Sequence, residues 1–145
     1  MTTDDRQAVL TLLKAREEAV LRGDAVAALA ALAEDVVLYD FPPPLAYRGT
    51  EAHDAAGLRA WFDTWDGPVE VRLHHETMVI EGDLAVVYGF ENMRGEKKGE
   101  GPLDQWSRIT TVLGRTDDGW RIVHEHPSFP LMMDGSGRAA TDLTP

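Results

Sequence analysis

The sequence predicts an α+β fold in which N-terminal helices pack over the concave face of a curved antiparallel sheet. Two observations carry this prediction. Apolar residues in the first part of the chain recur at helical spacing, and from residue 68 onward the pattern changes to strands separated by turn residues. A strongly bent sheet with helices across its concave side leaves a cone with an open mouth. Such mouths are frequent ligand pockets.

The first predicted helix covers residues 5 to 22. One face of it is apolar, formed by Val9, Leu12, Leu13 and Val20. Arg16 stands in the middle of this apolar stripe. Gly23 can end the helix, and Asp24 can cap a second, Ala- and Leu-rich helix over residues 25 to 33.

A short β-branched strand follows and ends at Asp40, because the three prolines after Phe41 prevent further strand pairing. Thr50 and Glu51 begin a third helical stretch. Its apolar face recurs at helical spacing and consists of Leu58, Trp61, Phe62 and Trp65.

Four strands are predicted in the remainder of the chain, over residues 69–80, 84–94, 103–115 and 119–126. Turn residues separate them, such as Glu81-Gly82-Asp83 and Asp117-Asp118-Gly119. Residues from 132 onward are polar and rich in Gly, Ser and Ala. We therefore expect one domain over residues 1–131 and a C-terminal arm over residues 132–145.

Composition and charge narrow the function classes. The 145 residues include 14 basic and 25 acidic side chains, a formal charge of −11, which repels phosphate backbones and anionic lipids. We expect neither nucleic-acid nor membrane binding. No cysteine is present, so thiolate chemistry is excluded. The start, "MTTDDRQAVL", lacks the layout of a signal peptide, and a cytoplasmic location is expected.

Three phrases of the sequence carry a family resemblance. "RGDAVAALAALAEDVVLYDFP", "YRGTEA" and "DDGWRIVHEHPSFP" stand in an order and spacing that resemble SnoaL-like members of the nuclear-transport-factor-2 (NTF2-like) superfamily, which includes ketosteroid isomerase. The resemblance implies the same cone-shaped fold over nearly the whole chain. It does not name a substrate, because this fold carries isomerases, cyclases, hydratases, hydrolases and binding proteins.

The resemblance also implies roles for individual residues. Asp40 falls where ketosteroid isomerase keeps its general-base aspartate. "GPLDQW" resembles the isomerase segment that holds a protonated aspartic acid, which corresponds to Asp104. Arg16 stands where the isomerase has a tyrosine, which is a departure from its pattern.

Strand alternation then predicts which side chains share the pocket. If Asp104 points inward, so do Trp106 and Arg108. The same register places both histidines of "WRIVHEH" on the inner face, with Val87, Gly89 and Glu91 opposite. Tyr88 and Phe90 have the opposite parity. The outer face, which would carry them together with Ile109 and Leu113, is apolar enough to predict a homodimer through the sheets.

His124 and His126 allow three interpretations. Imidazoles can exchange protons near neutral pH, and a neighbouring carboxylate can orient them. Two histidines on one strand can also bind a metal ion, with a third ligand from Asp40, Glu91 or Asp104. A purely structural hydrogen-bond network is the remaining possibility.

Aromatic and long side chains are candidates for the pocket wall. Trp61 and Trp106 are the leading ones, with Tyr39 and Met78 behind them, and they favour an aromatic or polycyclic ligand. Arg108 can bind a substrate oxygen or pair with a carboxylate.

The leading functional prediction is a cofactor-independent acid–base enzyme of the isomerase, cyclase or lyase type. Its substrate would be a small, largely apolar or aromatic carbonyl compound. Asp40 or His126 would remove a proton next to the carbonyl, while Asp104, Arg16 or His124 would stabilise the enolate charge. Two alternatives stay open: a small-molecule binding protein without chemistry, and a metal-dependent enzyme that uses His124 and His126.

Overall fold

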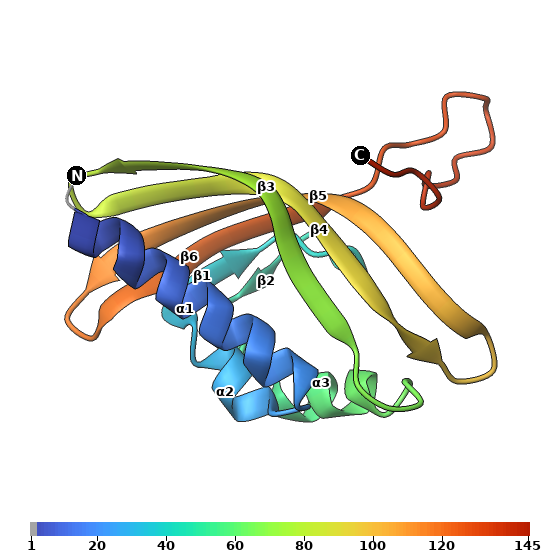
Figure 1. The fold of residues 1–145 in the computed structure, drawn as a ribbon, viewed down its shortest axis with the longest axis horizontal. Helices are drawn as coiled ribbons and strands as arrows, with labels where there is room; N and C mark the ends of the chain where they lie inside the picture. Colours follow the sequence, from blue (N-terminus) through green and yellow to red (C-terminus); the bar gives the residue numbers. More distant parts are fainter. Residues whose placement is uncertain (1–2) are drawn as a thin grey trace.

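The computed structural model describes residues 3–145 and consists of one long and several short helices, two short strands among them, and then a long antiparallel meander (Figure 1). The helices are α1 (Thr3–Leu21), α2 (Ala25–Leu29), the 3-10 turn η1 (Gly49–Glu51) and α3 (Ala55–Phe62). The strands are β1 (Leu32–Leu38), β2 (Tyr47–Arg48), β3 (Glu70–Glu81), β4 (Leu84–Lys97), β5 (Gly101–Thr116) and β6 (Gly119–Ser128).

The six strands form one curved sheet that does not close, in the order β2-β1-β6-β5-β4-β3. Strand β1 is parallel to β6, and every other neighbouring pair is antiparallel. Helix α1 lies across one face of this sheet, with α2 and α3 at the end of α1 (Figure 1). The predicted α+β architecture, with N-terminal helices on a curved antiparallel sheet, is confirmed.

The predicted caps are confirmed, but two helices are shorter than expected. Gly23 has a positive φ of 69°, and the Asp24 carboxylate accepts a hydrogen bond from the backbone N–H of Ala27 at 3.0 Å. Helix α2 ends at Leu29 instead of residue 33, because Leu32 already pairs with Ile122 of β6. Strand β1 ends at Leu38, before the predicted end at Asp40.

The third helix begins later than predicted. Thr50 and Glu51 belong to η1, and α3 starts at Ala55 after Asp54, whose carboxylate accepts a hydrogen bond from the N–H of Gly57 at 2.9 Å. The capping carboxylate therefore sets the first residue of α3.

A β-bulge in β3 changes which of its residues face the helices. His75 and Glu76 together oppose the single residue Gly89, between the pairs His74–Phe90 and Thr77–Tyr88. A β-carbon at Gly89 would lie 2.8 Å from the carbonyl oxygen of His74, so only glycine fits. Before the bulge, Val71 and Leu73 line the cavity described below. After it, Met78 and Ile80 are buried in the core.

A second bulge, at Val123 of β6, has the same effect and corrects the predicted histidine positions. Leu113 pairs with Ile122 and Val112 with His124, so Val123 is the extra residue. Ile122 is in the core, and beyond the bulge it is Glu125 that faces the cavity. The prediction that His124 and His126 face inward is wrong, because it assumed unbroken alternation.

Strand β5 also has the opposite parity from the one predicted. Ile109, Thr111 and Leu113 face inward and are buried. The prediction that Asp104, Trp106 and Arg108 point into the cone is therefore wrong. The prediction that Ile109 and Leu113 lie on the outer face is wrong for the same reason.

Strand β4 has no bulge and follows the predicted alternation. Val87 is in the core and Glu91 faces the cavity, whereas Tyr88 and Phe90 are exposed on the outer face. The two bulges in β3 and β6 leave the register of β4 and β5 continuous.

The core lies between α1 and the inner face of the sheet. Its buried members include Val9, Leu13, Val36, Met78, Ile80, Val87, Leu113, Trp120 and Ile122. After β6 the chain forms no further strand or helix up to residue 145, apart from an isolated bridge between Leu131 and Ala139. Within residues 3–145, no helix is long and apolar enough to cross a membrane.

Candidate active site

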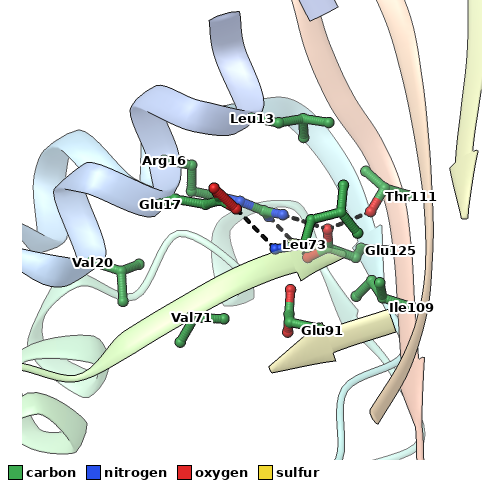
Figure 2. A pocket seen from close by; sticks show the side chains of 10 residues that line it. All are labelled: Leu13, Arg16, Glu17, Val20, Val71, Leu73, Glu91, Ile109, Thr111 and Glu125. Atoms are coloured by element: carbon green, nitrogen blue, oxygen red, sulfur yellow. Dashed lines mark hydrogen bonds and ion pairs between the residues drawn. The ribbon is translucent and has the colours of Figure 1, made fainter. Parts of the chain in front are cut away.

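A cavity of about 180 Å³ lies between α1 and the inner face of the sheet, and it adjoins the core at Leu13 (Figure 2). Half of its lining is aliphatic and half is polar. The aliphatic residues are Leu13, Val20, Val71, Leu73 and Ile109, and the polar ones are Arg16, Glu17, Glu91, Thr111 and Glu125.

An ion pair between Arg16 of α1 and Glu125 of β6 crosses this cavity. The Nη1 and Nη2 groups of Arg16 donate to the two carboxylate oxygens of Glu125 at 2.9 and 2.7 Å. Thr111 donates a further hydrogen bond to Glu125 at 2.7 Å. The side chains of Arg16 and Glu125 are only 20% and 14% exposed, so the pair is largely withdrawn from water. It joins the helix to the sheet with fixed geometry.

The environment keeps both members of this pair charged. Burial opposes the charge on Glu125, but Arg16 and the hydrogen bond from Thr111 outweigh it, so the pKa of Glu125 lies below its ordinary value. Burial likewise opposes the charge on Arg16, yet the carboxylate of Glu125 holds the pKa of Arg16 above its ordinary value.

Glu17 stands one residue from Arg16 on α1 and anchors the helix to β3. Its Oε2 atom accepts a hydrogen bond from the backbone N–H of Leu73 at 3.0 Å. Strand β3 is at the edge of the sheet, so a side chain satisfies a backbone group there. The other oxygen of Glu17 lies 3.7 Å from the guanidinium of Arg72.

Glu91 of β4 is the polar group of the cavity that has no partner. Among residues 3–145 no group donates a hydrogen bond to its carboxylate, which lies below the Arg16–Glu125 pair in Figure 2. Burial, and then the negative charge of Glu125, raise the pKa of Glu91 to about 7, although Arg16 acts in the opposite direction. Near neutral pH, Glu91 can therefore both accept and release a proton.

The sequence-predicted residues divide between the cavity and its surroundings. Arg16 and Glu91 meet inside it. Asp40 is exposed and accepts a hydrogen bond from the N–H of Phe41 at 2.8 Å. Its charge nevertheless contributes to the raised pKa of Glu91, so it lies within electrostatic reach of the cavity.

Glu17, Thr111 and Glu125 were not predicted as site residues. Glu125 stands between the two histidines in the sequence, and a bulge is needed to turn it inward. Glu17 and Thr111 carry no motif. The sequence pointed to Glu17 only indirectly, because its neighbour Arg16 interrupts an apolar helix face and so marks this part of the helix as a possible site.

The two histidines form a cluster with Tyr39 outside the cavity. The ring centroid of Tyr39 lies 4.6 Å from that of His124 and 5.5 Å from that of His126, both edge-on. The Nδ1 atom of His124 lies 2.6 Å from the carbonyl oxygen of Val37. Over residues 3–145, no three His, Asp or Glu side chains gather as metal ligands, so the pair lacks the third ligand of a zinc site.

Asp104, Trp106 and Arg108 lie outside the cavity. Asp104 accepts a hydrogen bond from the buried Asn92 at 2.7 Å, and the Trp106 ring lies 5.1 Å from that of His74. Arg108 donates to Ser128 at 3.1 Å and is exposed.

Trp61 and Met78 also lie away from the cavity lining. Trp61 contacts Phe62 and Trp65, each with ring centroids 5.6 Å apart. Met78 belongs to the hydrophobic core. No aromatic ring belongs to the described lining of the cavity, whose wall is aliphatic.

A comparison with protein-family models identifies the family of the chain. Residues 9–132 match the model of the SnoaL-like domain, which spans most of the sequence. The protein belongs to the SnoaL-like family, within the NTF2-like superfamily that the sequence indicated.

Solved structures show the same fold. An NTF2-like protein of unknown function from Pseudomonas putida KT2440 is 27% identical and superimposes with a TM-score of 0.85, over 100% of this chain and 99% of that one. A candidate dehydratase of the NTF2-like family from Streptomyces avermitilis is 21% identical, with a TM-score of 0.71 over 90% and 99% of the chains.

A third structure is described as that of a candidate aromatic ring hydroxylase from Novosphingobium aromaticivorans. It is 23% identical, with a TM-score of 0.69 over 88% of this chain and 90% of that one. No curated protein matches the sequence.

The Arg16–Glu125 pair gives a stability prediction. Arg16→Met should lower the free energy of unfolding by about 2–4 kcal/mol, because it leaves a largely buried carboxylate without its cation. Urea denaturation measures the loss. The matched control is Arg22→Met, whose pair with Asp24 is exposed and 3.5 Å long, and which should cost less than about 0.5 kcal/mol.

The double variant Arg16→Met/Glu125→Gln should recover part of the loss, since neither charge then remains buried. Equal costs for Arg16→Met and Arg22→Met would contradict the importance of the buried pair.

Glu91 gives a prediction on stability and pH. Its folded pKa of about 7 exceeds the ordinary value of 4.5, so between these values the folded chain holds a proton that the unfolded chain has lost. The contribution of Glu91 to stability is therefore present at low pH and is lost as the pH rises toward 7 and beyond.

We expect the free energy of unfolding of the native protein to fall, relative to Glu91→Gln, by about 2–3 kcal/mol between pH 5 and pH 8. Urea denaturation across this range measures the difference. Glu96→Gln, an exposed change on the same strand, is the control. If the curves of Glu91→Gln and the native protein run parallel, Glu91 does not titrate near neutrality.

Proposed function

We propose that the protein is an acid–base enzyme, and that Glu91 is the group that transfers the proton. The observation that carries the proposal is a pair of carboxylates in one cavity whose pKa values move apart. The pKa of Glu91 is raised to about 7, whereas that of Glu125 is lowered. Such a separation is typical of sites where one carboxylate does the proton transfer and the other stays charged.

The substrate in this proposal is a small, largely apolar carbonyl compound. Glu91 takes a proton from the carbon next to the carbonyl, and the electron pair of the broken C–H bond moves into the enolate. Arg16 still has N–H groups that Glu125 does not occupy, and these can donate to the enolate oxygen.

The subsequent step decides the reaction type within this class. The protonated Glu91 can return the proton to another carbon, which is an isomerisation. Alternatively, it can protonate a departing β-hydroxyl group, which leaves as water. The dehydratase description of the Streptomyces avermitilis relative agrees with the second outcome.

The size and wall of the cavity refine the predicted ligand. A cavity of about 180 Å³ compares with the roughly 150 Å³ that hold a benzene-sized molecule in an engineered protein core. The cavity therefore favours a ligand with one ring inside it. The wall is aliphatic, so Trp61 and Trp106 have no place in recognition of the ring.

The other residues predicted from the sequence keep different roles in the proposal. Asp40, near the cavity, adds negative charge that favours the protonated form of Glu91. Tyr39, His124, His126, Asp104 and Arg108 take no part in the proton transfer. A binding protein without chemistry is the alternative, and it uses the same cavity.

Three further proposals follow from the sequence. The homodimer would form through the outer sheet face, where Val79, Tyr88 and Phe90 are 51%, 47% and 37% exposed. Sedimentation analysis should give twice the chain mass, and Phe90→Glu should give the mass of one chain. We also propose that the protein is cytoplasmic. The chain would consist of one domain, residues 1–131, and a C-terminal arm, residues 132–145.

Hydrogen exchange in deuterated water tests the enzymatic proposal. One-ring ketones and enones are incubated with the protein, and proton NMR follows the loss of the signal of the C–H next to the carbonyl. We expect catalysed exchange that Glu91→Gln reduces by about 10²–10⁴-fold, as removal of a general base does. The value of kcat/KM should rise with pH and level off above about 7, because only ionised Glu91 accepts the proton.

Glu96→Gln is the control and should leave the exchange unchanged. Equal exchange in the native protein and Glu91→Gln would remove Glu91 from the mechanism. Binding of these compounds without any catalysed exchange would favour the binding protein.

A further inference from the structure

The polar groups that line the cavity are short of free hydrogen-bond donors. The hydroxyl of Thr111 donates to Glu125, and the backbone N–H of Leu73 donates to Glu17. Two N–H groups of Arg16 are held by Glu125. Apart from Glu91 in its protonated form, only the remaining N–H groups of Arg16 are left, among the described residues that line the cavity, to donate to a ligand.

Free acceptors, in contrast, are concentrated at Glu91. Neither oxygen of its carboxylate receives a hydrogen bond from residues 3–145, and Figure 2 shows the carboxylate beside the cavity, apart from the dashed network above it. Glu91 is half-buried, so its free oxygens are open to water or to a ligand in the cavity. A ligand that donates a hydrogen bond to Glu91 would take the place of water there.

The charges that face Glu91 are predominantly negative. Arg16 and Glu17 face it from α1, Glu125 from β6, and Asp40 from the loop after β1. Arg72 of β3 is engaged by Glu17, Glu18 and Glu70 at the rim. Arg16 neutralises the charge of Glu125. The net charge around Glu91 is therefore negative, from Glu17 and Asp40, whether or not Glu91 itself carries a proton.

We infer that the cavity selects one-ring compounds that bring an O–H or N–H donor to Glu91 and carry no negative charge, namely alcohols (the β-hydroxy carbonyl compounds of the dehydration route among them), phenols and protonated amines. The inference deepens the proposed function, because it uses the same cavity and the same carboxylate. It assigns to Glu91 a second role as the residue that determines which functional group the ligand presents.

The same arrangement rejects anions. A ligand that enters as a full anion, such as a carboxylate or phosphate, would lie beside Glu91 and Glu17, with Asp40 nearby, while the charge of the one nearby guanidinium is already balanced by Glu125. Like charges at short range in a site poor in water are unfavourable, and this repulsion gives specificity against anions.

Four probes of matched size separate these contributions. Benzylamine is a cation with N–H donors, benzyl alcohol is a neutral donor, anisole accepts without donating, and benzoate is an anion. Methyl NMR signals of Val20, Val71 and Ile109, which line the cavity, report binding there and give each dissociation constant.

At pH 8 we expect benzylamine to bind about tenfold or more tightly than benzoate, and benzyl alcohol more tightly than anisole. From pH 6 to pH 8 the affinity for benzylamine should rise about tenfold as Glu91 loses its proton, while that for benzyl alcohol changes less.

Glu91→Gln keeps the size of the side chain and an acceptor oxygen but removes the charge. It should weaken benzylamine about tenfold, abolish the pH dependence of its binding and leave benzyl alcohol within about threefold. Glu96→Gln, which removes an exposed charge from the same strand, should change none of the four affinities.

Benzoate binding in the cavity as tightly as benzylamine would overturn the inference, as would an unchanged benzylamine affinity in Glu91→Gln. An absence of methyl shifts with all four probes would overturn it too. These readouts need no turnover. If the predicted affinity order appears and no carbonyl compound exchanges its protons, the inference holds and the proposed enzymatic function fails.

Discussion

The cavity depends on one interaction, the two-point contact between the Arg16 guanidinium and the Glu125 carboxylate. It links the middle of α1 to β6 across the space between helix and sheet, and Thr111 completes it. Without it, an arginine in an apolar helix face would be an unpaired charge against the core. Because Arg16 neutralises the charge of Glu125, Glu91 is left as the carboxylic acid of the cavity without a cationic partner.

Two extra residues in the sheet decide which side chains take part. The bulges opposite Gly89 and at Val123 reverse the alternation of β3 and β6 partway along each strand. One part of the inner face is thereby filled with Met78, Ile80 and Ile122 of the core, while another part receives Leu73 and Glu125 of the cavity. The hydrophobic core and the polar cavity share the same strands without sharing side chains.

The fold was predictable from the sequence, and much of the site was not. Helical spacing, turn residues and family phrases located most of the elements, and Arg16 stood out as a charge in an apolar stripe. Glu91 was placed inward because β4 alternates without interruption. The positions of His126 and Trp106 were predicted wrongly because the face of each strand residue was counted from one reference residue. A bulge, or a reference residue assigned to the wrong face, places every later side chain on the opposite face of the sheet.

Val123 thus separates two chemistries that are adjacent in the chain. In "VHEH" a carboxylate stands between two imidazoles, and the bulged conformation of Val123 determines which kind of group meets the ligand. If the same segment paired without the bulge, the strand beyond Ile122 would shift by one residue, and His124 would stand opposite Thr111 in place of the acid. The choice between an acid and a histidine in this cavity is therefore a matter of strand register, with no substitution in the strand.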